Sequence, residues 1–226
     1  MLDKAQRFTK PFKKEDLIMC ALWAKEGGGE IYLIPEDSYQ AVCSQIYDIG
    51  HQFSELYGKA AHQCIVIWEL LEERNKFTKD GIDYDYPRQI SNFYTVSLHE
   101  KSRLRKDLES WRGRAFTPDE LAGFDIHKLI GANCMLQIIH KTKDTKTRAV
   151  IASITKLPKG IVPTTPESKT VVYSMEDGVW PSETPEWVIK RIKESEEWKA
   201  KASNQVDEPA YAADTANDDG DDQVPF

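Results

Sequence analysis

The sequence predicts a mainly β domain with one helix between its third and fourth strands, and three observations support this prediction. Five segments between residues 38 and 157 alternate apolar with polar residues or form short apolar runs. Between the third and fourth segments, Leu104, Leu108 and Trp111 follow the spacing of an amphipathic helix. Prolines and glycines then separate this region from a last helical segment and an acidic tail.

The first three strands are expected at residues 38–50, 62–71 and 90–99. The first alternates and ends at a glycine, the second is a nearly continuous apolar run, and the third is rich in Tyr, Thr and Val. Residues 75–89 lie between the second and third strands. Their Asp80-Gly81 pair predicts a hairpin turn, and Pro87 argues against a central strand there.

The period then changes from strand to helix. A helix is expected at residues 102–112, and Gly113 ends it. Thr117 is expected to cap a second helix, with Pro118 at its first position and Glu120 completing a capping box.

The last two strands are expected at residues 129–142 and 147–157, joined by the charged turn 143–146. The predicted order is therefore three strands, a helix and two strands. This order matches a five-stranded Greek-key barrel of the oligonucleotide/oligosaccharide-binding (OB) type, which carries its helix between strands three and four.

The expected organisation has four parts: an N-terminal arm packed on the body (1–37), the barrel (38–160), a linker with a C-terminal helix (161–202) and a disordered acidic tail (203–226). The C-terminal helix is expected at residues 185–201. Its Trp187, Ile192 and Trp198 are available to pack on the barrel.

Charge is divided unevenly between body and tail. The chain has 37 acidic and 30 basic residues, and seven of the acids lie in the tail, so the body is neutral. Six basic residues occur in 99–114 against three acids, and seven occur in 128–159 against Asp144 alone. Each patch is a candidate path for an anionic ligand, although runs of charge are commonly only solvated faces.

Cysteine and histidine patterns do not indicate a metal centre or a cofactor. The four cysteines, Cys20, Cys43, Cys64 and Cys134, form no CxxC pair, which favours reduced thiols. No apolar run approaches the roughly 18 residues of a membrane span, and the N-terminus has no secretory pattern. We therefore expect a cytoplasmic protein with no membrane association.

Catalytic motifs are also missing: the sequence contains no phosphate-binding loop, GxSxG or HExxH. Asp80, Asp83 and Asp85 suggest a metal-dependent nuclease, but a turn with solvated acids accounts for them as well. We expect a protein that is not an enzyme.

Single-strand-binding barrels combine a basic groove for phosphates with aromatic rings that stack on bases. Strand alternation makes Phe93 and Tyr47 the stacking candidates, whereas Trp68 shares a face with core residues. The candidate phosphate contacts are the cations of the basic helix and of the last hairpin: Lys101, Arg103, Arg105, Arg112, Arg114, Lys141, Lys143, Lys146 and Arg148.

The chain ends in Asp221-Asp222-Gln223-Val224-Pro225-Phe226. This tip resembles the C-terminal Asp-Asp-x-Ile-Pro-Phe of bacterial-type single-stranded DNA-binding proteins. The resemblance implies a partner-binding tail formed by Asp218, Asp219, Asp221, Asp222, Val224, Pro225 and Phe226. Physically, the tip offers carboxylates for Arg or Lys, a proline that limits chain entropy and a ring to bury. A solubilising tail that ends in Phe is the alternative.

Residues 97–117 and the strands up to residue 158 also look like phage-encoded proteins of the replication region. Together the two resemblances imply a single-stranded DNA-binding protein of the host cell cytoplasm. It would cover DNA in replication, recombination and repair and recruit a polymerase, helicase, primase or nuclease through its tip. The alternative is a replication accessory or host-factor-binding protein whose acidic tail mimics DNA.

Overall fold

The computed structural model describes residues 32–55, 58–79 and 81–204, without the side chains of residues 79 and 204. Its strands are β1 (Ser38–Ser54), β2 (Lys59–Lys79), β3 (Ile82–Thr95), β4 (Asn133–Lys143), β5 (Lys146–Lys156) and β6 (Val171–Tyr173). Five of them follow the order β3-β2-β1-β4-β5, and β6 pairs with β1. The mainly β fold and the helix between the third and fourth strands are confirmed. The sheet described here is open, with β3 and β5 at its edges.

The first strand, β1, holds the sheet together. It pairs with β2 along its length, with β4 through residues 38–42 and with β6 through residues 45–47. Its register shifts between Cys43 and Gln45 and again between Asp48 and His51. Such bulges bend a strand and increase its twist, so β1 can serve two partners on one edge.

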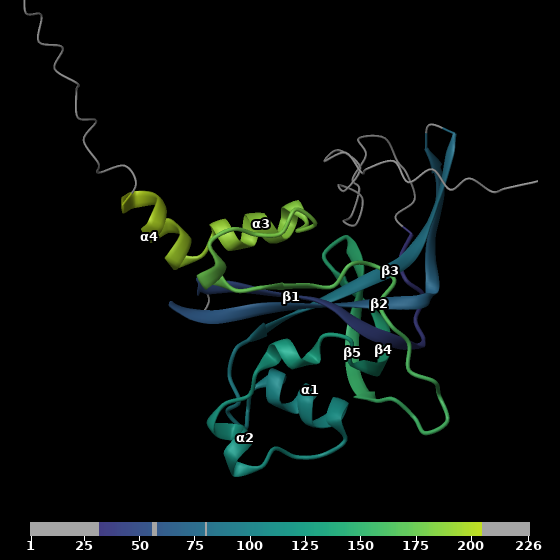
Figure 1. The fold of residues 1–226 in the computed structure, drawn as a ribbon, viewed down its shortest axis with the longest axis horizontal. Helices are drawn as coiled ribbons and strands as arrows, with labels where there is room; N and C mark the ends of the chain where they lie inside the picture. The colour runs from purple at the N-terminus through teal and green to yellow at the C-terminus, as the bar shows by residue number, and fades with distance from the viewer. Residues whose placement is uncertain (1–31, 56–57, 80, 205–226) are drawn as a thin grey trace, which may run out of the picture.

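Helices cover both faces of the sheet (Figure 1). On one face lie α1 (Arg103–Arg112), α2 (Pro118–Ala122) and the 3₁₀ helix Ile126–Leu129, and on the other lie the 3₁₀ helix Met175–Asp177, α3 (Glu186–Lys193) and α4 (Glu196–Asn204). The capping box predicted for α2 is present, since Thr117 and Glu120 each bond the other's backbone N–H.

The first core lies between the sheet and α1. Leu104, Leu108 and Trp111 are buried, as the helical spacing predicted, and they pack with Trp68 and other buried residues of the sheet. The indole of Trp111 donates a hydrogen bond to the carbonyl of Asn133, at 2.8 Å, which fixes the helix to β4.

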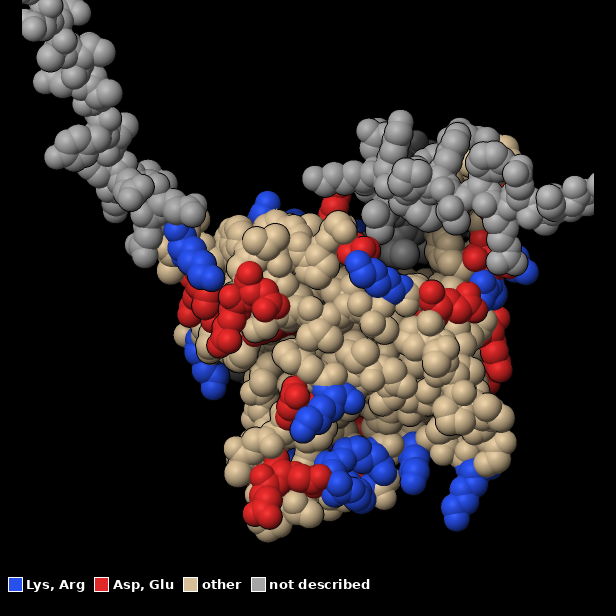
Figure 2. Space-filling view, in the orientation of Figure 1, with Lys and Arg blue, Asp and Glu red and all other residues tan. Residues whose placement is uncertain are grey.

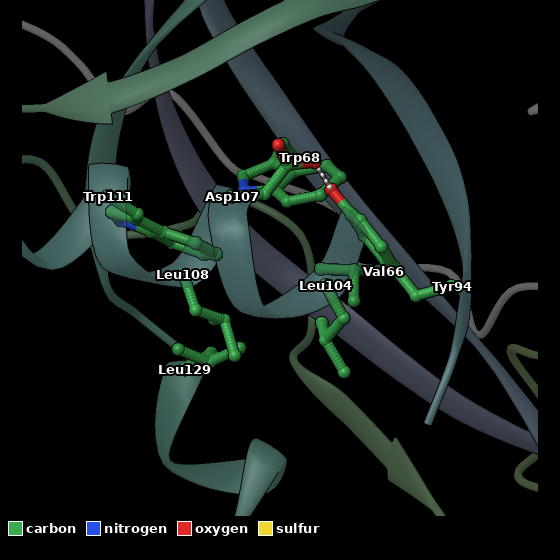
Figure 3. Close-up of a pocket in the computed structure, with 8 residues that line it drawn as sticks. All are labelled: Val66, Trp68, Tyr94, Leu104, Asp107, Leu108, Trp111 and Leu129. Atoms are coloured by element: carbon green, nitrogen blue, oxygen red, sulfur yellow. Dashed lines mark hydrogen bonds between the residues drawn. The ribbon is translucent and has the colours of Figure 1, made fainter. Parts of the chain in front are cut away.

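A small cavity remains beneath α1, lined by Val66, Trp68, Tyr94, Leu104, Asp107, Leu108, Trp111 and Leu129 (Figure 3). The Tyr94 hydroxyl donates to Asp107 at its edge, at 2.9 Å. The cavity volume is about 10 Å³, close to the least that holds one water molecule. It is far too small for a nucleobase, so this cavity is not a base-binding site.

The second core lies on the opposite face of β1 and β2. Tyr47 and Ile65 from the sheet pack there with Tyr173 of β6 and with Val188 and Ile192 of α3. The prediction that the C-terminal segment packs on the sheet is confirmed by the burial of Ile192 and by the contacts of Trp187 and Trp198, both partly buried.

Two details of this C-terminal region differ from the sequence-based expectation. The helix predicted at 185–201 is two helices, because Ser195 is buried between them and its hydroxyl accepts a hydrogen bond from the Trp198 N–H. The linker contains β6, which the proline spacing did not predict. Only three residues long, β6 depends on its pairing with β1.

The β2–β3 hairpin is longer than expected. The segment 75–89 was predicted to separate two strands, yet it belongs to them almost throughout. Pro87 lies within β3 and pairs with Arg74 next to a register shift. A proline is tolerated there because β3 is an edge strand. Gly81 has a φ of 75°, as the expected turn requires.

A hydrogen-bonded contact fixes α4 to the end of β1. The carboxylate of Glu197 accepts from the backbone N–H of His51, at 2.8 Å, and contacts the His51 ring. That ring stacks on His62, whose Nε2 lies 2.7 Å from Asp48. The bond with Glu197 raises the pKa of His51. Burial would raise the pKa of Glu197, but its bonds with His51 outweigh burial and lower it.

Gly50 makes this contact possible, which we expect to be measurable as stability. Its φ is 67°, and a Cβ built on it would lie 2.6 Å from Glu197 Oε2. Gly58 has a similar φ of 60° and nothing within 4 Å. Both Ala variants strain the backbone, but only Gly50→Ala also crowds α4. We expect Gly50→Ala to lower the free energy of unfolding by about 1–3 kcal/mol more than Gly58→Ala. Equal losses in urea unfolding would contradict this account.

The His51–Glu197 pair predicts a pH dependence. Since the folded pKa of His51 lies above its ordinary 6.5, the stabilisation is complete below pH 6.5 and is lost as pH rises through the folded value. The lowered pKa of Glu197 sets the acid limit, since the stabilisation falls when this carboxylate is protonated below its ordinary 4.5. An NMR titration should show the His51 pKa falling towards 6.5 in Glu197→Gln. Glu196→Gln, which removes only a nearby charge, should change it less; equal shifts would refute the assigned contact.

Candidate nucleic-acid interface

Four basic side chains lie on one face of the β4–β5 hairpin. Lys141 pairs directly with Arg148, and Lys143 pairs with Lys146. Since side chains alternate along a strand, these two pairs share a face. The turn between them contains Asp144, whose φ is 55°. Thr142 and Thr147 occupy the other face, where their hydroxyls lie 2.9 Å apart.

These four cations are exposed, and none forms an ion pair with any residue that the structure describes. Like charges directly opposite each other destabilise a strand pair. The hairpin therefore keeps two unfavourable pairs, and no described acid forms an ion pair with any of the four cations. An anion bound across this face would neutralise both, and phosphate oxygens suit Lys and Arg donors.

The basic helix has a different electrostatic character. Four predicted phosphate contacts are engaged within the protein: Arg103 with Asp107, Arg105 with Glu109, and Arg112 and Arg114 with Glu120. Figure 2 shows blue and red side chains next to each other over the region of α1 and α2. The positive charge of this patch is therefore largely neutralised. Only Lys101, among the five predicted contacts of this segment, is exposed without an ion pair in the described structure.

Two of these arginines build the loop between α1 and α2. Glu120 contacts the guanidinium groups of both Arg112 and Arg114, and the Arg112 group also lies 4.5 Å from the centre of the Phe116 ring. The bond with Arg114 and the Thr117 N–H hold the pKa of Glu120 far below its usual range. Because Arg112 is largely covered, its first role is structural.

Of the two stacking candidates, Tyr47 is buried and Phe93 is exposed. Tyr47 is fully buried in the second core, and its hydroxyl donates to Gln45, so this ring cannot reach a base. Tyr47 points away from Ile46, as the alternation predicted, but α3 covers the face to which it points, and Tyr173 of β6 packs beside it. Phe93 is 41% exposed and lies opposite the buried Tyr94, as expected. Its ring centre lies 6.1 Å from that of Trp187, and the Arg191 guanidinium lies 5.8 Å from it.

Two acids of the β2–β3 hairpin, Asp83 and Asp85, interact with other residues of the same hairpin. Asp85 forms ion pairs with Arg74 and Lys76, and the bond with Arg74 lowers its pKa. Asp83 accepts from the Thr78 hydroxyl at 2.6 Å, and Asp80 lies outside the described residues. Within the described ranges no group of three His, Cys, Asp or Glu side chains is placed to hold a metal ion.

Cys43, Cys64 and Cys134 are buried free thiols. Burial raises all three pKa values, that of Cys64 to about 12, so at neutral pH they remain protonated. Cys20 and the whole partner-binding tail, from Asp218 to Phe226, lie outside the described part of the chain.

Sequence reasoning missed an aromatic cluster on the β2–β3 hairpin. Phe77 and Tyr84 stack on each other, and Tyr86 meets Phe77 edge to face. Their alternate positions around the Asp80-Gly81 turn would have placed all three on one face, had the segment been taken as strand.

The hairpin cations should limit the stability of the free protein. Lys146→Glu replaces the repulsion with Lys143 by an attraction, so we expect it to raise the free energy of unfolding by about 0.2–1 kcal/mol. Lys59→Glu is a matched control, because Lys59 is exposed and its cross-strand partner is the neutral Ser54. Thermal unfolding at low salt measures both variants. A loss of stability in Lys146→Glu would show that the two lysines do not repel each other.

Among the described residues, no helix is both long and apolar enough to cross a membrane. No model of a known protein family matches the chain. No solved structure matches it either. The site therefore has to be interpreted from its own geometry.

Proposed function

We propose that this protein binds single-stranded DNA without sequence choice and covers it during replication, recombination and repair. The acidic tail, in this proposal, recruits replication or recombination proteins, and the DNA is held by the body. In this proposal the protein is not an enzyme.

The strand arrangement supports an OB-type barrel as the binding body. The order β3-β2-β1-β4-β5, with α1 between β3 and β4, is that of the five-stranded Greek-key barrel, and the edge strands β3 and β5 approach each other. In such barrels the loop between the fourth and fifth strands contacts nucleic acid. Here that loop is the turn of the cationic hairpin.

The observation that carries the proposal is the cationic face formed by Lys141, Lys143, Lys146 and Arg148. It retains two like-charged cross-strand pairs in a body whose other basic patch is mostly ion-paired. Contacts of this kind bind the phosphate backbone and carry no sequence information. They suit a protein that must cover any sequence.

A second candidate is an interaction protein with a DNA-mimicking tail. The observation that favours it is the coverage of the outer face of β1 and β2 by α3, which removes Tyr47 from any strand-binding surface. In this alternative the hairpin binds an acidic protein.

Fluorescence anisotropy with labelled oligo-dT tests the proposal. We expect binding that weakens steeply with salt, and tighter binding when residues 203–226 are deleted, because the tail competes with DNA as a polyanion. Lys143→Glu combined with Lys146→Glu should weaken binding at least about tenfold at low salt, whereas Lys59→Glu should have little effect. Absence of binding at low salt would reject DNA binding. A double variant that binds like wild type would place the site elsewhere.

A further inference from the structure

The outer half of the β2–β3 hairpin, residues 74–87, carries an aromatic face that belongs to neither core. Figure 1 shows this hairpin extending away from the sheet at the upper right. A two-stranded hairpin that leaves its sheet is only marginally stable by itself. Its side chains therefore have to stabilise it, and they are also placed to meet a ligand.

One face of the hairpin consists of rings. Phe77 pairs with Tyr84 across the strands, and their ring centres lie 4.9 Å apart with planes inclined by 9°. Tyr86 meets Phe77 at 5.9 Å and 83°. Alternation places Ile82, which is 55% exposed, and Arg88 on the same face of β3. The three rings are partly exposed, so planar groups can reach them.

The opposite face carries the charges and braces the hairpin. Arg74 forms ion pairs with Asp85 and with Glu167, which lies 2.7 Å away in the linker before β6. Asp83 is bonded to Thr78 on the same side. The two aspartates thus point away from the rings, and they do not place negative charge on the aromatic face.

The aromatic face is connected to the cationic hairpin by a short segment. The Arg88 guanidinium lies 4.1 Å from the centre of the Tyr32 ring, which is 59% exposed. Two residues later, the carbonyl of Ile34 lies 2.8 Å from His140 Nε2 in β4, directly before Lys141. Residues 32–34 therefore contact both hairpins, although His140 shares its face of β4 with Thr142, opposite Lys141.

We propose that Phe77 and Tyr84 stack on the bases of a single strand whose phosphates are bound by the cationic hairpin. This inference rests on the proposed function and adds to it the site that receives the bases. Stacking on aromatic rings is tolerant of sequence, because every base presents a π face. In this arrangement the β4–β5 hairpin binds the phosphates of the strand, and the β2–β3 hairpin stacks on its bases.

The test compares two labelled oligonucleotides of equal length, oligo-dT and an abasic strand with the same phosphates. The double variant Phe77→Leu with Tyr84→Leu keeps apolar bulk and removes the π faces. We expect it to bind oligo-dT about tenfold more weakly and the abasic strand as wild type does. Tyr84→Phe should keep wild-type affinity for both. Phe53→Leu is the control, since Phe53 is 58% exposed near the other end of β2, opposite Ala60. Circular dichroism checks that the variants stay folded.

The possible results separate this inference from the proposed function. If wild type binds neither strand, DNA binding itself fails. If the Leu double variant binds oligo-dT like wild type, or loses affinity equally for both strands, the rings do not stack on bases and the inference is overturned. Unchanged DNA binding, together with a loss of stability when residues 1–31 are deleted, would assign the aromatic face to the N-terminal segment instead.

Discussion

The fold depends on one strand whose two faces and two edges are all used. From Ala41 to Tyr47 every residue of β1 is buried, because one face packs under α1 and the other under α3. One edge bonds β2, and the other bonds β4 and then β6. Residues 41–47 of β1 therefore have no surface left for a ligand, and a binding site near this stretch is displaced to elements that project from it.

That displacement explains where the candidate interface lies. The two hairpins, β2–β3 and β4–β5, extend beyond the pairing with β1, and there the side chains stop serving the core. In β4 the buried alternation ends at Ile138, and the cationic face begins at Lys141. In β3 the buried residues end at Pro87, and the rings of Tyr84 and Tyr86 follow towards the tip. Because these hairpin positions are not needed for core packing, evolution can select their side chains for ligand binding.

Much of the fold was predictable because its signals are local. The amphipathic spacing of Leu104, Leu108 and Trp111 and the capping box at Thr117 each need only a few neighbouring residues. The coverage of Tyr47 was not predictable from strand alternation, which shows that a residue faces away from one core but not that a second core exists. The three residues of β6 likewise form a strand only because β1 offers a bonding edge. For the site, composition located the two basic patches but could not show which of them is neutralised by ion pairs within the protein. The pairing of Arg112 and Arg114 with Glu120 depends on the loop between α1 and α2.

The contrast between these two patches gives the strongest reason to assign function to the hairpin. In both, the sequence concentrates basic residues, but in α1 carboxylates four residues away are within reach on the same helix face, as Asp107 is for Arg103. In the β4–β5 hairpin the strand register offers each cation another cation as its closest partner. A sequence under selection for stability alone would place an acid at one position of each pair. Neither pair has an acidic partner among the described residues, so both are open to an anion, and a polyanion would neutralise them together.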